Sequence, residues 1–413
     1  MSINGSGPLK GTRSAVFLPA DVWAEQLRVR ALREPPAHDL PALLRFFGEH
    51  SSYYRDRIGD AGAWSQVPPL GKADVAGIPV RSPTPVRAAR TSGTSGFQVT
   101  IRNNAREREF RRALLYRPHL FYDLPRAVRQ VVFVDGLWCA TPGSAPKYFE
   151  YGDRSYRTWF AGAGADPAEV LHLLTTLRPQ LIRGISSGIV RFIESAGVAL
   201  GHLGTRYVAP GGEYLRPRWR EMMEDAFAAA VLDRYGSTES GALAWQCPHC
   251  RRYHANVDEI VIEPDVDGLL TTPLFLSSQP LLRYRLGDCI RFDEAEPDCA
   301  VRLPTVTIEE ARRDDWIIDG AGRKVSPLSF RFERVPHLDA WRLHQQADGS
   351  LLMYYESARP DEVEPCLARE LADTIPDRPC SIVPGIWRLQ RQGKFKRVSS
   401  ELASMRVPSD SNS

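Results

Sequence analysis

The sequence predicts an α/β fold: a large N-terminal domain of helix-covered, mostly parallel sheets with a strand-rich subdomain, then a small C-terminal α+β domain. Between about residues 127 and 235, strand-like runs alternate with amphipathic helical segments, which is typical of a parallel sheet covered by helices. After Gly236 the chain becomes strand-rich. From about Asp314 helical and strand patterns mix again, and this second change indicates the small domain.

The first part of the chain is predicted to begin with helices. Apolar residues at helical spacing predict two amphipathic helices, over residues 21–34 and 41–57. A loop and hairpin region follows and extends through residue 100. Within it, residues 98–101 have the composition of a strand.

The alternating region shows clear element boundaries. Residues 131–134 form an apolar run typical of a buried strand. A helix start follows at Asp166, with Pro167 at the first helical position and Glu169 at the third. The remaining elements are expected as strands at 180–185, 205–209, 230–235, 259–263, 281–284 and 289–292, and as helices at 187–200, 216–229 and 363–375.

The composition is that of a folded globular protein. The chain has 413 residues, enough for two or three domains of roughly 100–200 residues each. A net charge of +3 without a long basic run disfavours nucleic acid as a partner. No apolar stretch approaches the roughly 20 residues that span a bilayer, and no signal peptide follows Met1. Seven cysteines, an odd number, disfavour a secreted disulfide scaffold, so we expect a cytoplasmic protein. The sequence leaves the oligomeric state, monomer or dimer, open.

A short loop rich in hydroxyls and glycines is a candidate phosphate-binding segment. Its backbone can approach a ligand closely, and successive N–H groups and hydroxyls can surround an anionic phosphate. It is not a Walker A loop, because no Gly-Lys-Ser/Thr follows. The segment consists of Thr91, Ser92, Gly93, Thr94, Ser95 and Gly96.

Further short segments follow this loop in a fixed order. They are Gly211-Gly212-Glu213, Tyr235-Gly236-Ser237-Thr238-Glu239, Tyr284-Arg285-Leu286-Gly287-Asp288, Arg312-Arg313-Asp314-Asp315 and Gly393-Lys394. The ordered set resembles the signature motifs of the acyl-adenylate-forming superfamily, which comprises acyl-CoA synthetases, peptide-synthetase adenylation domains and luciferases. It is most similar to the phenylacetate-CoA ligase branch.

The resemblance implies a two-step ligase. A small carboxylic acid would react with ATP to give an acyl-AMP and pyrophosphate, and the acyl group would then pass to a thiol of CoA or an acyl carrier protein. Attack of a carboxylate on the α-phosphate passes through a charged, in-line transition state. Catalysis of such a step consists mainly of positioning and electrostatic stabilisation.

The nucleotide-binding residues follow from the same resemblance. Residues 91–96 are expected to hold the β- and γ-phosphates, and 211–213 to line the nucleotide and acyl pockets. Segment 235–237 is expected at the nucleotide, with Tyr235 against adenine. Asp288 would accept hydrogen bonds from both ribose hydroxyls, and Arg312 would assist at the ribose.

The resemblance also implies the catalytic residues and a mobile domain. Thr238 would contact the α-phosphate, and Glu239 would bind Mg²⁺, a hard ion that prefers oxygen ligands. Lys394 would bridge the carboxylate and the α-phosphate. Asp314 resembles the hinge about which the small domain rotates, so we place the domains at 1–313 and 314–413, the second carrying the catalytic lysine.

The acyl acceptor and the acid stay open. Residues 319–325 keep the glycine-rich character of the family's C-terminal loop but depart from the residue pattern that is usual in CoA ligases. An amine or another nitrogen nucleophile is therefore the alternative acceptor, and a non-catalytic nucleotide-binding protein is a further alternative. Trp138 and Tyr214 favour an aromatic acid over an amino or alkyl acid.

A Cys/His cluster suggests a structural zinc site. Cys247, Cys250 and His254 form a C-x2-C-x3-H knuckle that can present three ligands. Structural zinc takes four ligands, and Cys299 is the expected fourth because relatives in this branch carry a cysteine element between the same motifs. The alternatives are two ordinary loop cysteines, a nucleic-acid-binding zinc ribbon, and a ligand set with Cys289 for Cys299 or His249 for His254.

Overall fold

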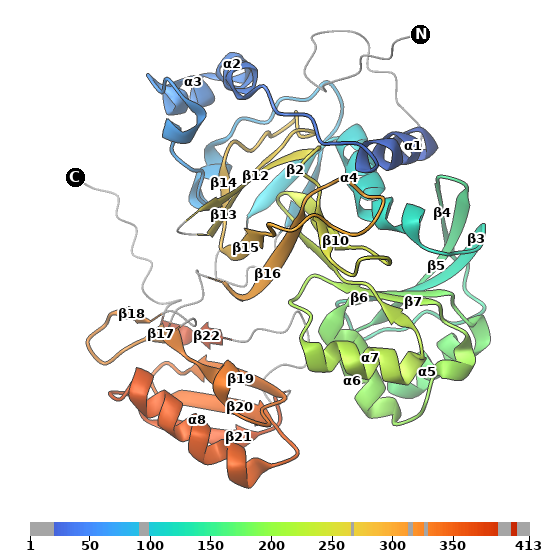
Figure 1. Ribbon diagram of the computed structural model, residues 1–413, viewed down its shortest axis with the longest axis vertical. Coiled ribbons are helices and arrows are strands. Elements are labelled where there is room, and N and C mark those ends of the chain that lie inside the picture. Colours follow the sequence, from blue (N-terminus) through green and yellow to red (C-terminus); the bar gives the residue numbers. More distant parts are fainter. Residues whose placement is uncertain are drawn as a thin grey trace.

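The protein is described from a computed structural model (Figure 1), which covers residues 20–90, 99–265, 268–312, 317–325, 329–386 and 398–402. The chain opens with three helices: α1 (Ala20–Ala31), α2 (Leu40–His50) and α3 (Ser52–Ile58). The single helix predicted over 41–57 is two helices. Ser51 adopts an extended conformation that ends α2, and its hydroxyl accepts a hydrogen bond from Tyr54 N and caps α3.

One large sheet dominates the molecule, in the order β15-β16-β11-β10-β9-β7-β6-β3-β5-β4, with β8 paired to β7. Strands β3, β5, β6, β7 and β9 are mutually parallel neighbours, and antiparallel strands extend the sheet at both ends. The strands are β3 (Ala127–Val134), β4 (Lys147–Tyr151), β5 (Arg154–Gly162), β6 (Leu181–Ile185), β7 (Tyr207–Gly211), β8 (Ala230–Val231), β9 (Arg234–Ser237), β10 (Gly241–Gln246), β11 (Tyr253–Ala255), β15 (Asp288–Phe292) and β16 (Thr305–Arg312).

Helices cover the parallel part of this sheet. α5 (Pro167–Leu177), α6 (Ser186–Ala196) and α7 (Pro217–Phe227) pack their apolar faces against it in one core. α5 begins as predicted, because the Asp166 carboxylate accepts a hydrogen bond from Ala168 N at 2.8 Å. α4 (Ala105–Tyr116) and the 3-10 helix η3 (Arg117–Phe121) belong to the other main core.

Two smaller sheets form the strand-rich part. One consists of β12 (Ile260–Asp265), β13 (Gly268–Pro273) and β14 (Tyr284–Leu286), and the other is the hairpin of β1 (Arg87–Arg90) and β2 (Thr100–Asn103). The strand predicted over 281–284 begins only at Tyr284. The strand predicted over 230–235 is divided into β8 and β9, which both pair with β7.

The residues after 316 form a small α+β unit with its own apolar core. Its four-stranded sheet has the order β21-β20-β19-β22 and packs against one helix. The elements are β17 (Ile317–Ile318), β18 (Lys324–Val325), β19 (Ala340–Gln345), β20 (Leu351–Glu356), α8 (Pro360–Thr374), β21 (Cys380–Pro384) and β22 (Val398–Ser400). The predicted hinge residue, Asp314, lies outside the described residues, so the boundary between 313 and 314 stays a prediction.

Among the described residues, no helix combines the length and the apolar character that crossing a bilayer requires.

Candidate active site

Two predicted motifs lie at the carboxyl ends of neighbouring parallel strands. β7 ends at Gly211, directly before Gly212 and Glu213, and Gly211 pairs with Arg234 at the start of β9. Residues 235–237 of the second motif lie within β9, and residues 238 and 239 follow its end. Ligands of open α/β sheets bind outside the carboxyl ends of such strands, so both motifs occupy the edge where a nucleotide is expected.

Tyr235 and Asp288 meet although their strands are far apart in the sheet order. The Tyr235 hydroxyl donates a hydrogen bond to Asp288 Oδ2 at 3.0 Å. Four strand steps separate β9 from β15, which would amount to roughly 19 Å in a flat sheet at about 4.8 Å per step. A tyrosine and an aspartate side chain cannot bridge that distance, so the sheet must curl and bring β15 back towards β9.

Arg312 lies beside Asp288 in the backbone. The two residues are partners in the antiparallel pairing of β15 with β16. The side chain of Arg312 lies outside the described part of the structure, and its role at the ribose stays a prediction.

Glu239 is buried and held by a tyrosine. Only 7% of Glu239 is exposed, and the Tyr284 hydroxyl donates to its Oε1 at 3.0 Å. Tyr284 belongs to the same predicted motif as Asp288. Segment 284–288 is therefore in direct contact with segment 235–239. This contact fixes the carboxylate that was predicted to bind Mg²⁺.

Arg111 of α4 is a site residue that the sequence analysis did not identify. Its guanidinium donates to the backbone carbonyls of Thr238 and Glu239, the latter at 3.0 Å. Burial lowers the pKa of Arg111 to about 10, and the nearby carboxylates of Glu239 and Glu107 partly oppose this shift. An arginine in a polar helix belongs to no local sequence motif. Only the position of Arg111 on the helix that follows the predicted phosphate-binding segment could have suggested its role.

Two glycines of the motifs are required by the backbone. A Cβ at Gly236 would lie 2.4 Å from Gly241 O, across the β9–β10 pair. Gly212 has φ +84°, in the left-handed region that favours glycine.

Glu213 is fixed to the start of α6. Its Oε2 accepts from the Ser187 backbone N–H at 2.7 Å, and its Oε1 accepts from the Ser187 hydroxyl at 2.9 Å. A carboxylate at a helix N-terminus is favourable because it satisfies backbone N–H groups that have no partner within the helix. This contact fixes the loop that contains 211–213.

Several predicted residues lie outside the described structure. These are Thr91, Ser92, Gly93, Thr94, Ser95, Gly96, Asp314 and Lys394.

The two aromatic residues that favoured an aromatic acid are not deeply buried. Trp138 is 53% exposed, and Tyr214 is half-buried. The exposure of these two side chains does not support an aromatic binding pocket, so the aromatic acid remains a prediction.

The structure brings four potential metal ligands together. One ligand atom each from Cys247, Cys250, His254 and Cys299 lies within 4.8 Å of the other three. His254 Nε2 is 3.5 Å from Cys250 Sγ and 3.3 Å from Cys299 Sγ. Tetrahedral zinc with bonds of about 2.0–2.3 Å needs ligand separations of roughly 3.3–3.8 Å, so these distances fit the ion.

The surroundings of the cluster also fit a metal. His254 Nδ1 is 2.7 Å from Leu303 O, which leaves Nε2 for coordination. Burial raises the pKa of the Cys247 thiol to about 12, and a bound cation would offset this cost by stabilising the thiolate. Neither Cys289 nor His249, the alternative ligands, belongs to this cluster.

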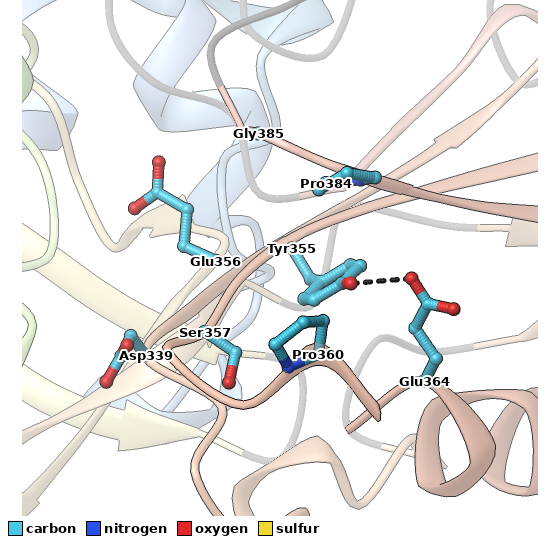
Figure 2. A pocket seen from close by; sticks show the side chains of 8 residues that line it. All are labelled: Asp339, Tyr355, Glu356, Ser357, Pro360, Glu364, Pro384 and Gly385. Carbon is cyan, nitrogen blue, oxygen red and sulfur yellow. Dashed lines mark hydrogen bonds between the residues drawn. The ribbon is translucent and has the colours of Figure 1, made fainter. Parts of the chain in front are cut away.

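A separate pocket of about 440 Å³ lies in the C-terminal unit (Figure 2). It is lined by Asp339, Tyr355, Glu356, Ser357, Pro360, Glu364, Pro384 and Gly385, and the Tyr355 hydroxyl donates to Glu364 Oε1 at 2.6 Å. None of the predicted site residues lines it.

Comparison with solved structures shows clear similarity of fold. A 2-hydroxyisobutyryl-CoA ligase in the postadenylation state, in complex with R3-HIB-AMP, matches with a TM-score of 0.62 at 16% identity over 93% of this chain and 90% of that chain. An open conformation of a ligase of the same name, with 2-HIB-AMP and CoA, gives a TM-score of 0.56 at 17% identity over 92% of each chain. No family model and no curated protein sequence matches the chain.

This chain shares the fold of these CoA ligases. The ATP-bound chimera RpMatB-BxBclM B3 matches less well, with a TM-score of 0.50 at 16% identity over 77% of this chain and 67% of that chain. The predicted fold class is confirmed. Within this fold, Tyr235 of segment 235–239 bonds to Asp288, and Glu239 of the same segment bonds to Tyr284 of segment 284–288.

Proposed function

We propose that the protein is an AMP-forming acid–thiol ligase of the phenylacetate-CoA ligase-like branch. The observation that carries the proposal is the direct contact of segment 235–239 with segment 284–288, through the Tyr235–Asp288 and Tyr284–Glu239 hydrogen bonds, in a chain that shares the fold of a CoA ligase. The two segments are far apart in the sequence, and hydrogen bonds to other side chains hold Tyr235, Asp288 and Glu239. Such preorganisation is what a charged, in-line transfer requires.

The first half-reaction joins the acid to AMP. A carboxylate oxygen of the acid attacks the α-phosphorus of ATP, the bond from that phosphorus to the bridging oxygen breaks, and pyrophosphate leaves. In this proposal residues 91–96 hold the departing phosphates, Tyr235 lies against adenine, and Asp288 and Arg312 bind the ribose. Thr238 contacts the α-phosphate, and Lys394 offsets the negative charge shared by the carboxylate and the α-phosphate.

A divalent cation is expected beside Glu239. Its carboxylate, together with phosphate oxygens, suits Mg²⁺, which supplies charge neutralisation when bound. Tyr284 would orient the carboxylate, and Arg111 would hold the backbone of residues 238 and 239 in place.

The second half-reaction transfers the acyl group. The thiol of CoA or of an acyl carrier protein loses its proton and attacks the acyl carbonyl, and AMP leaves. The proposed boundary between domains 1–313 and 314–413 allows the small domain to rotate between the two steps. An amine acceptor is the alternative, because residues 319–325 depart from the usual CoA-ligase loop.

The Cys247, Cys250, His254 and Cys299 cluster is proposed to bind one structural zinc ion. Four protein ligands would leave no open coordination position, so the ion would stabilise the fold and take no part in the reaction. It would tie the β10–β11 hairpin to the segment before β16.

The experiment that tests the function is carboxylate-dependent ATP–pyrophosphate exchange without CoA, across aryl, amino and alkyl acids. Exchange with one class of acid is expected. Lys394→Ala should lower exchange by at least roughly 100-fold while ATP still binds, because charge stabilisation in the transition state is lost. Lys396→Ala, two residues away, is the matched control. The proposal fails if no acid supports exchange although ATP binds, or if Lys394→Ala exchanges at the wild-type rate.

A further inference from the structure

A group of buried polar side chains lies between the parallel strands and the segment that ends α4. Tyr116 links its members: its ring lies 4.8 Å from that of His119 and 5.0 Å from that of Tyr156, and the Arg183 guanidinium lies 4.4 Å above it. We call this group the arginine–tyrosine cluster, which consists of His119, Tyr122, Tyr151, Tyr156, Arg183 and Arg234.

Polar atoms of this cluster lack hydrogen-bond partners within the described part of the chain. They are His119 Nδ1 and Nε2, the hydroxyls of Tyr122, Tyr151 and Tyr156, Arg183 Nε, and Arg234 Nε and Nη1. His119, Tyr151 and Tyr156 are fully buried, and Arg183 is only 5% exposed. A buried polar atom without a partner destabilises the folded state, so such a concentration indicates a site that a ligand completes.

The cluster also carries an excess of positive charge. Arg183 donates to the neutral Gln130 Oε1 at 3.3 Å, and within the described residues Arg183 Nε and Arg234 Nε and Nη1 have no hydrogen-bond partner, carboxylates included. The acid nearest Arg234 in sequence is Asp233, which accepts from the Tyr253 hydroxyl at 2.7 Å.

The pKa of Arg234 agrees with that excess. Burial, with Arg183 nearby, lowers the pKa of Arg234 to about 9, and Asp233 only partly opposes this shift. Water can satisfy hydroxyls, but it does not neutralise two buried guanidinium groups.

The position of the cluster connects it to the candidate active site. Arg234 directly precedes Tyr235, and its Nη2 donates to Ala209 O at 3.0 Å, two residues before Gly211. Arg183 pairs with Ala209 across β6 and β7. The cluster therefore lies further along the same strands whose carboxyl ends carry 211–213 and 235–239.

We propose that the arginine–tyrosine cluster binds an anionic group at the far end of the acyl substrate. The acid that the enzyme activates would then carry a second negative charge, and a dicarboxylic acid is the simplest member of the class. Arginine presents several N–H donors to a carboxylate, and the tyrosine hydroxyls and a neutral His119 add further donors. This inference rests on the proposed adenylating function.

The first test uses the full-length protein in ATP–pyrophosphate exchange with matched acids. The panel contains α,ω-dicarboxylates of increasing length and benzoates with a meta or para carboxylate. Each acid is compared with its neutral ω-amide and ω-methyl ester. The inference predicts a kcat/KM at least roughly tenfold higher for one or more diacids than for their neutral partners, because a site built for polar groups rejects analogues that lack them.

The second test changes the cluster itself. Arg183→Gln and Arg234→Gln should each lower the ratio of kcat/KM for the diacid to that for the neutral partner by at least roughly tenfold. Arg183→Lys, which keeps the charge, should restore part of the ratio. Arg157→Gln, on the exposed face of neighbouring β5, is the matched control and should leave the ratio unchanged. Melting temperatures identify any variant that does not fold. If one of the two glutamine variants does not fold, the ratio is measured with the other.

The outcomes separate the two proposals. If kcat/KM for the ω-amides and ω-methyl esters is at least as high as for the matched diacids, the inference is wrong and the proposed adenylation still stands. An unchanged ratio in both folded glutamine variants would do the same. No exchange with any acid, despite ATP binding, would overturn the proposed function itself.

Discussion

At the scale of single residues, the side chains of the candidate site are positioned by other protein groups. Tyr235 holds Asp288, Tyr284 holds Glu239, and Arg111 holds the backbone that carries Glu239. Each contact fixes an acidic group, which in the proposed reaction would reduce the reorganisation required.

Tyr235→Phe tests the hydrogen bond to Asp288. The ring remains, but Asp288 loses a donor, so we expect KM for ATP to rise by roughly 3- to 10-fold with little change in kcat, the effect of one lost hydrogen bond. Initial rates at varied ATP concentration measure this. Tyr355→Phe removes a comparable bond, to Glu364, in the C-terminal unit and should leave KM for ATP unchanged. Equal effects of the two variants would contradict the assignment.

Glu239→Gln tests the proposed magnesium ligand. The amide keeps the volume and can still accept from Tyr284, but it loses the charge. We expect adenylation to fall by roughly 100-fold and the Mg²⁺ concentration for half-maximal rate to rise. Exchange assays over a magnesium titration measure both. Glu224→Gln, a partly exposed residue on α7, serves as control, and a normal magnesium response in Glu239→Gln would refute the role.

At this scale the sequence could indicate motif residues but not their partners. Tyr235, Glu239 and Asp288 stand in short recognisable segments, whereas Arg111 and Arg183 stand among ordinary helix and strand residues. Their positions depend on which strands become neighbours and on how the sheet curls. Neither property is local to the sequence around them.

At the scale of elements, the β10–β11 hairpin carries the metal-binding prediction. We expect about one equivalent of zinc in purified protein, and its loss in Cys247→Ser with a lower melting temperature. Metal analysis and thermal unfolding measure these. Cys366→Ser, on α8, is the matched control. Metal-free protein that unfolds at the same temperature as the zinc-loaded form would refute the site.

The η3 segment depends on a buried ion pair. Arg117 and Asp258 have fully buried side chains and lie 2.7 Å apart, and Arg117 Nε also donates to Leu27 O. Arg117→Met leaves Asp258 buried without its partner, so the free energy of unfolding should fall by about 3–5 kcal/mol. Arg206→Met breaks the exposed pair with Asp123 and should cost at most about 1 kcal/mol. Denaturant unfolding compares them, and equal losses would contradict this account.

Most elements could be predicted because hydrophobic periodicity is local. The start of α5 follows from Asp166 and Pro167, and α7 and α8 differ from their predicted bounds by a few residues. The division at Ser51 was missed because its cap depends on backbone geometry. The separation of β8 from β9 was missed because both pair with β7, which the residues between them do not reveal.

At the scale of the whole molecule, the C-terminal unit contacts the helical face of the large sheet. Ala340, Tyr354 and Ile386 share an apolar core with residues of α6 and α7. Glu356 is at the same face, where it interacts electrostatically with Glu194 and Arg216. Figure 2 shows Glu356 and Asp339 among the residues that line the pocket of the C-terminal unit.

The ionisation of Glu356 should make stability depend on pH. Burial, with Glu194 nearby, raises its pKa from 4.5 to about 7 in the folded protein. The folded state then binds more protons than the unfolded state between these values, so stability from this group is greatest below about pH 4.5 and is lost as pH rises to about 7. Glu356 is partly exposed, so the difference should be only about 1–2 kcal/mol.

Glu356→Gln isolates this contribution. The variant should melt a few degrees above wild type at pH 8, and the difference should vanish near pH 4.5. Glu362→Gln, an exposed residue of α8, controls for a general charge effect. A pH-independent difference between wild type and Glu356→Gln would contradict the assigned pKa.

The position of the β10–β11 hairpin in the large sheet also affects the proposed nucleotide site. β10 and β11 lie between β9, which carries Tyr235, and β16 and β15, which carry Arg312 and Asp288. In the proposed nucleotide site, the hairpin would therefore set the spacing between Tyr235 and the Arg312–Asp288 pair. If that proposal holds, we expect oxidation of the Cys247 or Cys299 thiol to disturb this spacing, so that nucleotide affinity falls before the protein unfolds.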